Sequence, residues 1–275
     1  MLAAVLLLSL LIFDGNMRIK TDQCSVLISG LPDGFSGTRI LQLSDLHGAS
    51  FGKDNFRLLQ AAQEAAPDYI FLTGDLADAP GQETAIRGLI AGLTALAPVY
   101  FVSGNHDWTC GWTEELFSLL EDCGVTVLRN EWVTLTRNGD AIVLAGAEDP
   151  NGPADMMTPE ALVTAIAEET GSPPTLLLNH RNDRLELYAS MGVPVVFSGH
   201  AHGGVIRVPG LGGLFGHGGT LFPENEAGLC ASGGTVMVVS RGLGNVPGTF
   251  RLGNPPQLLC VVLENRIIPA RNVTE

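Results

Sequence analysis

The stretch Arg39-Ile40-Leu41-Gln42-Leu43-Ser44-Asp45-Leu46-His47 decides the fold. Its first five residues have the composition of a short buried strand, and a polar turn follows them directly. The same arrangement recurs four times, with YIFL (69–72) before TGDLAD, VYFV (99–102) before SGNHD, TLLL (175–178) before NH, and PVVF (194–197) before SGHAH. Continuous apolar runs of this kind predict strands that are covered on both faces.

Stretches with helical periodicity separate these strands, at residues 55–66, 82–97, 113–123 and 159–169. Further strands are predicted at residues 125–128, 132–136, 141–145, 236–239 and 258–263. We therefore expect an α/β fold in which two packed sheets are flanked by helices. No internal repeat or linker divides the chain, so we expect a hydrophobic segment over residues 1–16 and one domain over residues 17–275.

Composition excludes several classes of protein. The 275 residues include 15 basic and 29 acidic side chains, a net charge of −14, which argues against a basic nucleic-acid-binding surface. Hydrophobic residues make up 45% of the chain and charged residues 16%, so a large core is expected and disorder is not. The five cysteines are scattered without a C-x-x-C pair, which predicts buried thiols rather than disulfides or a zinc ribbon.

The N-terminal run MLAAVLLLSLLIF (1–13) is apolar but shorter than the roughly 20 residues that a membrane-spanning helix needs. It also lacks the basic region and the cleavage site of a signal peptide. We expect the truncated end of a membrane anchor and hence membrane association through the N-terminus; the alternative is a hydrophobic helix docked on the domain. Arg18 and Lys20 follow the run, but two charges do not decide the side of the membrane.

Metal-type side chains follow all five buried strands, at the edge of an α/β sheet where ligands bind. They are Asp45, His47, Asp75, Asn105, His180, His200 and His202. This set of oxygen and nitrogen ligands without a thiolate suits Mn, Fe or Zn. Seven ligands exceed what one tetrahedral ion can use, whereas two ions about 3.5–4 Å apart that share a carboxylate would use them all. Each motif alone is a weak signal, but their joint occurrence at strand ends is a strong one.

The order D-x-H (45–47), G-D-x-x-D (74–78), G-N-H-D (104–107), His180 and G-H-x-H (199–202) resembles that of the calcineurin-like metallophosphoesterases. Ala66-Pro67-Asp68 and Ser240-Arg241-Gly242-Leu243-Gly244 add a resemblance to their bacterial, membrane-anchored phosphodiesterases of the YkuE and YaeI type. The resemblance implies a four-layer α/β/β/α sandwich of two mixed β-sheets with two divalent metal ions (Mn, Zn or Fe). Asp45, His47 and His202 would hold one metal, Asn105, His180 and His200 the other, and Asp75 both.

The resemblance also implies catalytic roles. A hydroxide that bridges the metals would attack the phosphate ester, and His106 would protonate the leaving oxygen or stabilise its charge. Asp107 would orient His106, whereas Asp78 would be either a loop residue or a residue that supports the ligands without binding a metal itself. Ala201 and Val205 replace the usual Thr and Gln of the last motif, which leaves the ligands intact. Arg181 follows His180, where it would either bind a substrate phosphate or form a surface salt bridge.

The substrate is the least determined part of the hypothesis. The glycine-rich stretch 209–219 contains Leu211, Leu214 and Phe215 and is either a mobile lid or a packed loop, with His217 as a loop residue. Together with the N-terminal segment, a lid would suit a phosphoester substrate such as a phospholipid or a lipid-linked nucleotide. The alternatives are a non-enzymatic metal-binding scaffold of the same fold, a phosphomonoesterase or a nuclease. The acidic chain disfavours the nuclease, but the metals themselves would attract an anionic substrate.

Overall fold

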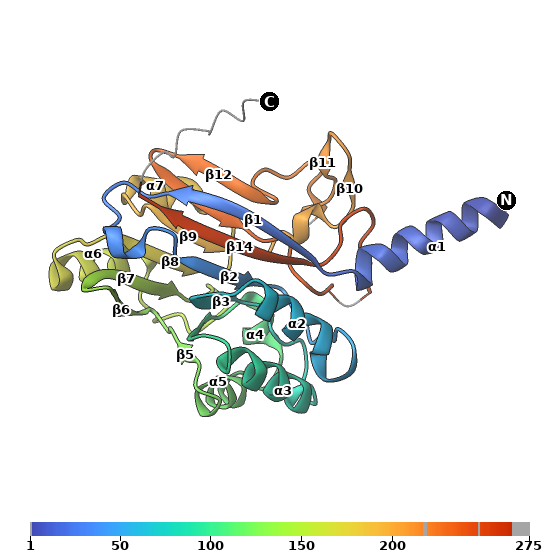
Figure 1. Ribbon diagram of the computed structural model, residues 1–275, viewed down its shortest axis with the longest axis horizontal. Helices are drawn as coiled ribbons and strands as arrows, with labels where there is room; N and C mark the ends of the chain where they lie inside the picture. The colour runs from blue at the N-terminus through green and yellow to red at the C-terminus, as the bar shows by residue number, and fades with distance from the viewer. Residues whose placement is uncertain (1, 217–218, 247, 266–275) are drawn as a thin grey trace.

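Two six-stranded β-sheets pack face to face at the centre of the computed structural model, and helices cover both outer faces (Figure 1). The structure describes residues 2–216, 219–246 and 248–265. Residues 266–275 of the expected domain, together with His217, Gly218 and Pro247, lie outside this range. The expectation of two mixed sheets flanked by helices is confirmed.

The first sheet has the strand order β1-β14-β2-β3-β4-β5. Its strands are β1 (Lys20–Leu27), β2 (Arg39–Leu43), β3 (Tyr69–Thr73), β4 (Val99–Val102), β5 (Thr126–Val127) and β14 (Gln257–Glu264). The strands β2 to β5 are parallel, and β14 runs antiparallel to β2. Its outer face carries α2 (Phe56–Glu64), α3 (Glu83–Thr94) and α5 (Thr113–Asp122).

The second sheet has the order β12-β13-β9-β8-β7-β6. Its strands are β6 (Glu131–Arg137), β7 (Asp140–Ala147), β8 (Thr175–Asn179), β9 (Val195–Ser198), β12 (Gly228–Ser232) and β13 (Thr235–Val239). The strands β7, β8, β9 and β13 are parallel, and the edge strands β6 and β12 are antiparallel to their neighbours. Helices α6 (Pro159–Thr170) and α7 (Leu185–Ser190) pack on its outer face.

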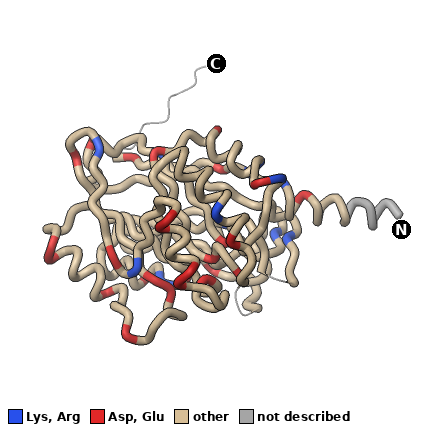
Figure 2. The backbone as a smooth tube through the Cα atoms, turned by 90° about the horizontal axis from the view of Figure 1, so that it is seen from below, with Lys and Arg blue, Asp and Glu red and all other residues tan. Residues whose placement is uncertain are grey.

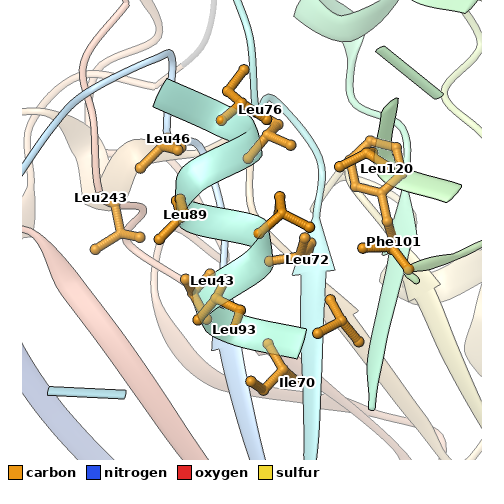
Figure 3. Close-up of a cluster of buried hydrophobic side chains, with 14 of the residues drawn as sticks. Leu43, Leu46, Ile70, Leu72, Leu76, Leu89, Leu93, Phe101, Leu120 and Leu243 are labelled. Carbon is orange, nitrogen blue, oxygen red and sulfur yellow. The ribbon is translucent and has the colours of Figure 1, made fainter. Parts of the chain in front are cut away.

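Alternation along the strands divides the core into layers. Ile40 and Phe71 point into the space between the sheets, whereas Leu41 and Leu43 point towards the helices. Figure 3 shows side chains of α3, such as Leu89, facing this outer layer. Between the sheets, the buried Gln42 amide donates to Thr73 Oγ1 (3.0 Å) and to the carbonyl oxygen of Ser198 in the second sheet (2.9 Å). This bond ties the two sheets together just below the ends of β2, β3 and β9.

Several elements were not anticipated. The edge strand β1 pairs with β14, but its residues are mostly exposed and polar, so no apolar run marks it. The helices α4 (Asn105–Thr109) and α7 are too short to produce a helical periodicity. A small ribbon of β10 (Arg207–Val208) and β11 (Gly212–Gly213) follows the last predicted ligand.

The N-terminal run forms helix α1 (Leu2–Met17), which projects from one end of the sandwich (Figure 1). Its last turn is held by Asn16, whose Oδ1 accepts from the side chain of Asn245 (2.7 Å) and the backbone N–H of Arg251 (3.1 Å). Among the described residues, no helix has both the length and the apolar character needed to cross a bilayer.

Candidate metal centre

The polar turns after β2, β3, β8 and β9 meet at one edge of the sandwich because these strands end there together. Backbone hydrogen bonds join them: Asp45 N–H donates to the carbonyl oxygen of Gly74 (3.0 Å) and Gly199 N–H to that of His180 (2.9 Å). His200 N–H donates to Asp45 Oδ1 (2.9 Å), which connects the turn of one sheet to that of the other. The turns therefore form one connected surface rather than independent loops.

Most of the predicted ligands adopt the left-handed backbone conformation that non-glycine residues avoid. The residues and their φ angles are Asp45 (50°), His47 (50°), Asp75 (54°), His200 (67°) and His202 (48°). Each such residue costs about 1–3 kcal/mol and persists only where the surrounding structure enforces it. Strain concentrated on five candidate ligands indicates that this edge is shaped for binding rather than for stability.

Three clusters of side chains among the described residues could hold a metal ion. One consists of His47, Asp78 and His106, and the other two consist of candidate ligands only and share one carboxylate. Asp45, His47, Asp75 and His202 offer ligand atoms that lie within 4.8 Å of one another, and so do Asp75, His180 and His200. Asp75 Oδ2 lies 3.7 Å from His47 Nε2 and 3.1 Å from His180 Nε2. Since the two imidazoles belong to different groups, this oxygen lies where a bridging ligand would be needed.

Two buried oxygen atoms at this edge have no hydrogen-bond partner among the described residues: Asp45 Oδ2 and Asn105 Oδ1. Asn105 is the first residue of α4 and comes directly after the turn that ends β4. An unpaired buried acceptor costs free energy, which a bound cation would offset. The residues therefore fit a pair of divalent ions with oxygen and nitrogen ligands.

A hydrogen bond to the backbone orients His180. Its Nδ1 lies 2.7 Å from the carbonyl oxygen of Thr73, so that Nδ1–H donates and Nε2 faces Asp75. Burial lowers the pKa of His180, but the Asp75 carboxylate outweighs it and raises that pKa to about 10. The bond to Thr73 thus leaves His180 Nε2 directed at Asp75, where it could bind a cation.

His106 lies beside the two groups and is paired with Asp78. The Nδ1 atoms of His106 and His47 are 2.8 Å and 2.7 Å from the same oxygen, Asp78 Oδ1. The hydrogen bond from His106 is the main cause that raises its pKa. Burial of Asp78 raises its pKa, but the hydrogen bonds from His106 and His47 outweigh burial and lower the pKa to about 2. Asp78 is thus a charged residue of the site that contacts the candidate ligand His47, which is the supporting role left open by the sequence, and not only a loop residue.

The expectation that Asp107 orients His106 is wrong. Neighbouring residues on a helix do not face each other, and the Asp107 carboxylate turns away into the buried turn after β3. It accepts hydrogen bonds from the backbone N–H groups of Gly104 (2.8 Å), Asp75 (2.8 Å), Leu76 (2.9 Å) and Ala77 (3.2 Å). Asp107 therefore holds together the two turns that carry Asp75 and Asn105.

Two arginines near the centre have contacts that the sequence did not reveal. Arg181 forms a two-pronged ion pair with Asp149, at 2.7 and 3.0 Å, which favours the salt-bridge interpretation over a phosphate contact. Arg251 is fully buried, donates twice to the carbonyl oxygen of Gly244, and lies 3.3 Å from His202 Nδ1. No sequence motif identifies Arg251, because only the folding of the chain brings it close to His202.

The glycine-rich stretch after the last ligands lies along this end of the molecule. Leu211 and Phe215 are exposed, whereas Leu214 is half-buried. Backbone bonds from Leu214 to Ile206 and from Phe215 to Gly204 attach the stretch to the turn that carries His202. His217 and Gly218 lie outside the described residues.

Comparison with known proteins gives a family match. A sequence profile of the calcineurin-like phosphoesterases matches residues 38–204, which include every candidate ligand. The uncharacterized protein YpbG of Bacillus subtilis is 32% identical over 226 residues, which cover 82% of this chain and 80% of YpbG. Phosphodiesterase YaeI of Escherichia coli is 28% identical over 66% of each chain.

A putative metallophosphoesterase of Caenorhabditis elegans, F40B5.2, is 31% identical over 74% of this chain. The match covers only 45% of the nematode protein. Among solved structures, a dimetal phosphatase from Danio rerio superposes with a TM-score of 0.50 at 12% identity, over 77% of this chain and 90% of that one. This structural likeness supports the fold.

Proposed function

The chain belongs to the calcineurin-like phosphoesterase family, and from this premise we propose that it is a metal-dependent phosphodiesterase. The observation that carries the proposal is the position of Asp75 Oδ2 between His47 and His180, one from each group of ligands. Paired metal ions that share a carboxylate are typical of enzymes that hydrolyse phosphate esters. The printed name of YaeI favours a diester over a monoester.

In this proposal Asp45, His47 and His202 hold one divalent ion and Asn105, His180 and His200 hold the other, with Asp75 shared. Bound ions would activate water at neutral pH and neutralise the phosphate charge. The residue choice suits Mn, Zn or Fe. The strained turns and the carboxylate of Asp107 keep the ligands in place before any ion binds.

His106 supplies the proton that the leaving oxygen needs. Its side chain is about a quarter exposed, so a substrate has access to the ring, and Asp78 holds Nδ1 and favours the protonated form. With Nδ1 fixed on Asp78, Nε2–H is the group left to donate. General acid catalysis of this kind contributes about 10²- to 10⁴-fold to the rate.

The proposed substrate is a lipid-linked phosphodiester, such as a phospholipid or a nucleotide joined to a lipid. The apolar helix α1 and the exposed Leu211 and Phe215 lie at the same end as the site and support this choice. The proposal includes membrane association through residues 1–16, with residues 17–275 as the phosphoesterase domain.

The competing function is a metal-binding scaffold without activity. Every candidate ligand position is filled by a residue that can bind a metal. The partly exposed His106, held by Asp78, is placed to donate a proton to a substrate, which a scaffold would not need. A phosphomonoesterase or nuclease would use the same centre, so a panel of substrates distinguishes these activities.

The test is hydrolysis of bis-p-nitrophenyl phosphate by the full chain. We expect activity with added Mn²⁺, loss of activity with EDTA, and at least a hundredfold loss in Asp75→Asn together with weaker Mn²⁺ binding. Asp122→Asn, at the end of α5, is the matched control and should behave as wild type. A metal-loaded protein that cleaves neither this diester nor p-nitrophenyl phosphate would support the scaffold instead.

A further inference from the structure

Exposed phenylalanines gather at the end of the molecule that carries the candidate metal centre. Five of the 11 phenylalanines are exposed: Phe13 (65%), Phe56 (65%), Phe215 (39%), Phe222 (59%) and Phe250 (48%). Leu211, at 67%, lies on the same ribbon as Phe215. We call these six side chains the apolar rim. Large exposed apolar groups that cluster in this way mark a surface for interaction.

Hydrogen bonds connect the segments of the apolar rim with one another and with the site. Arg251, next to Phe250, is bound through its backbone to Asn16 of α1 and through its side chain to Gly244, whose N–H donates to Asp45. Leu252 accepts from Arg207 of β10, which continues into the ribbon with Leu211. On the other side, Arg57 donates to the carbonyl oxygen of Met17 and so fixes Phe56 beside α1. These contacts connect the segments that carry the apolar rim with one another and with the turn that carries Asp45.

Basic side chains lie among the apolar ones. Arg18 and Lys20 follow α1, and Lys53 and Arg57 lie on either side of Phe56; Figure 2 shows basic segments beside the base of the N-terminal helix. A cleft of about 490 Å³ between α1 and α2 is lined by Phe13, Met17, Arg18 and Arg57 together with Asp14 and Glu64. Arg18 is paired with Asp14, and Arg57 donates to the carbonyl oxygen of Met17. The cleft is therefore apolar with balanced charges, which suits the interfacial region of a lipid bilayer.

Acidic residues balance the basic ones at the base of α1, where Asp14 is paired with Arg18 and Asp22 with Lys20 (2.7 Å), whereas the outer helices α5 and α6 are strongly acidic. Helices α5 and α6, on the two outer faces, carry the exposed carboxylates Glu114, Glu115, Glu121, Glu160, Glu168 and Glu169. An anionic surface would repel these two helices more strongly than it would repel the balanced charges at the base of α1. The charge distribution thus orients the molecule with the apolar rim towards such a surface.

We propose that the apolar rim is a membrane-docking face that places the metal centre against the surface of a phospholipid bilayer. Its phenyl and isobutyl groups project singly from four separate segments, the arrangement that inserts between lipid headgroups. The inference concerns the location of the metal centre at the bilayer surface. It rests on the proposed function in one respect, because a lipid-linked substrate would then come from the bilayer.

The test compares two triple variants of the full chain by sedimentation with vesicles of equal parts phosphatidylcholine and phosphatidylglycerol. Phe56→Ser/Leu211→Ser/Phe222→Ser removes part of the rim, and Leu27→Ser/Met157→Ser/Leu229→Ser removes three apolar side chains of comparable exposure elsewhere. We expect the rim variant to bind the vesicles about tenfold or more weakly than wild type and the control variant to bind equally. Because both retain α1, the difference isolates the rim.

A second measurement reports contact directly. Phe222→Trp should give emission that vesicles with brominated acyl chains quench, whereas Met157→Trp should not. Equal vesicle binding of the two triple variants, or no quenching at position 222, would overturn the proposal. A concentration-dependent dimer that only the rim variant loses would also overturn it, since a second copy would then cover the face. Hydrolysis of bis-p-nitrophenyl phosphate without vesicles should be unchanged in all these variants, which separates failure of the docking face from failure of the proposed activity.

Discussion

At the scale of single residues, one carboxylate oxygen connects a proposed metal ligand with the proposed proton donor. Asp78 Oδ1 accepts from both His47 and His106, so the position of the proposed acid is fixed relative to the ligand beside it. Asp107 is next to His106 in the chain, but its carboxylate accepts hydrogen bonds from backbone N–H groups instead. Substitutions at these residues should therefore have different effects.

The first prediction concerns His106→Ala. Its side chain belongs to neither group of proposed ligands around Asp75, so the variant should bind Mn²⁺ as wild type does but lose about 10²- to 10⁴-fold in kcat for diester hydrolysis. Steady-state kinetics and atomic emission measure the two quantities. Unchanged kcat would show that the assigned role is wrong, and Asp122→Asn again serves as the control.

The second prediction concerns pH. A carboxylate favours the charged imidazolium, so Asp78 raises the pKa of His106, and the neutral amide in Asp78→Asn should lower it. An activity that needs protonated His106 falls as the pH rises through that pKa. The alkaline limb of the kcat profile should therefore move to lower pH in the variant. An alkaline limb that stays at the same pH, or moves to higher pH, would contradict the proposed effect of Asp78 on His106.

The third prediction is that Asp107→Asn acts on stability. One amide group would replace an oxygen that accepts from two backbone N–H groups, which leaves buried donors unpaired. We expect a loss of about 2–4 kcal/mol in the free energy of unfolding by urea, compared with under about 0.5 for the exposed Asp122→Asn. A loss as small as that of the control would mean that the four hydrogen bonds do not contribute to the free energy of unfolding.

At the scale of elements, close approach between turns positions the shared carboxylate. A Cβ atom at Gly104, the residue before α4, would lie 2.2 Å from Asp75 Oδ1. Gly104→Ala should therefore displace Asp75 and reduce the Mn²⁺ bound per chain after dialysis. Gly88→Ala on α3 has open space around it and should keep full metal content and gain about 0.5–1 kcal/mol of stability. Equal metal content in both variants would contradict this account of the site.

The sequence predicted the buried strands well because their apolar runs are continuous, as in β3 and β8, and polar turns end them. It did not reveal β1, an exposed edge strand held by pairing with β14 rather than by its own pattern. Contacts between distant segments also lack a local signal. Thus the approach of Arg251 to His202 and the turn of Asp107 towards Asp75 became visible only in the fold.

At the scale of the whole molecule, the two sheets bring turns from distant parts of the chain to one edge, and α1 projects from one end of the sandwich (Figure 1). The net charge of −14 would oppose binding of a phosphate ester, so the positive field must be local. Bound divalent ions would supply it, and stripping them should leave a folded protein with little affinity for phosphate esters.

The central claim is that this chain holds two metal ions around Asp75 and uses them to cleave a phosphate ester. The most direct test is to titrate chelator-stripped protein with Mn²⁺ while bound metal and bis-p-nitrophenyl phosphate hydrolysis are recorded together. The account predicts saturation at two ions per chain, with activity rising as the second ion binds, and loss of both in Asp75→Asn. Saturation at one ion, or two bound ions without hydrolysis, would contradict it.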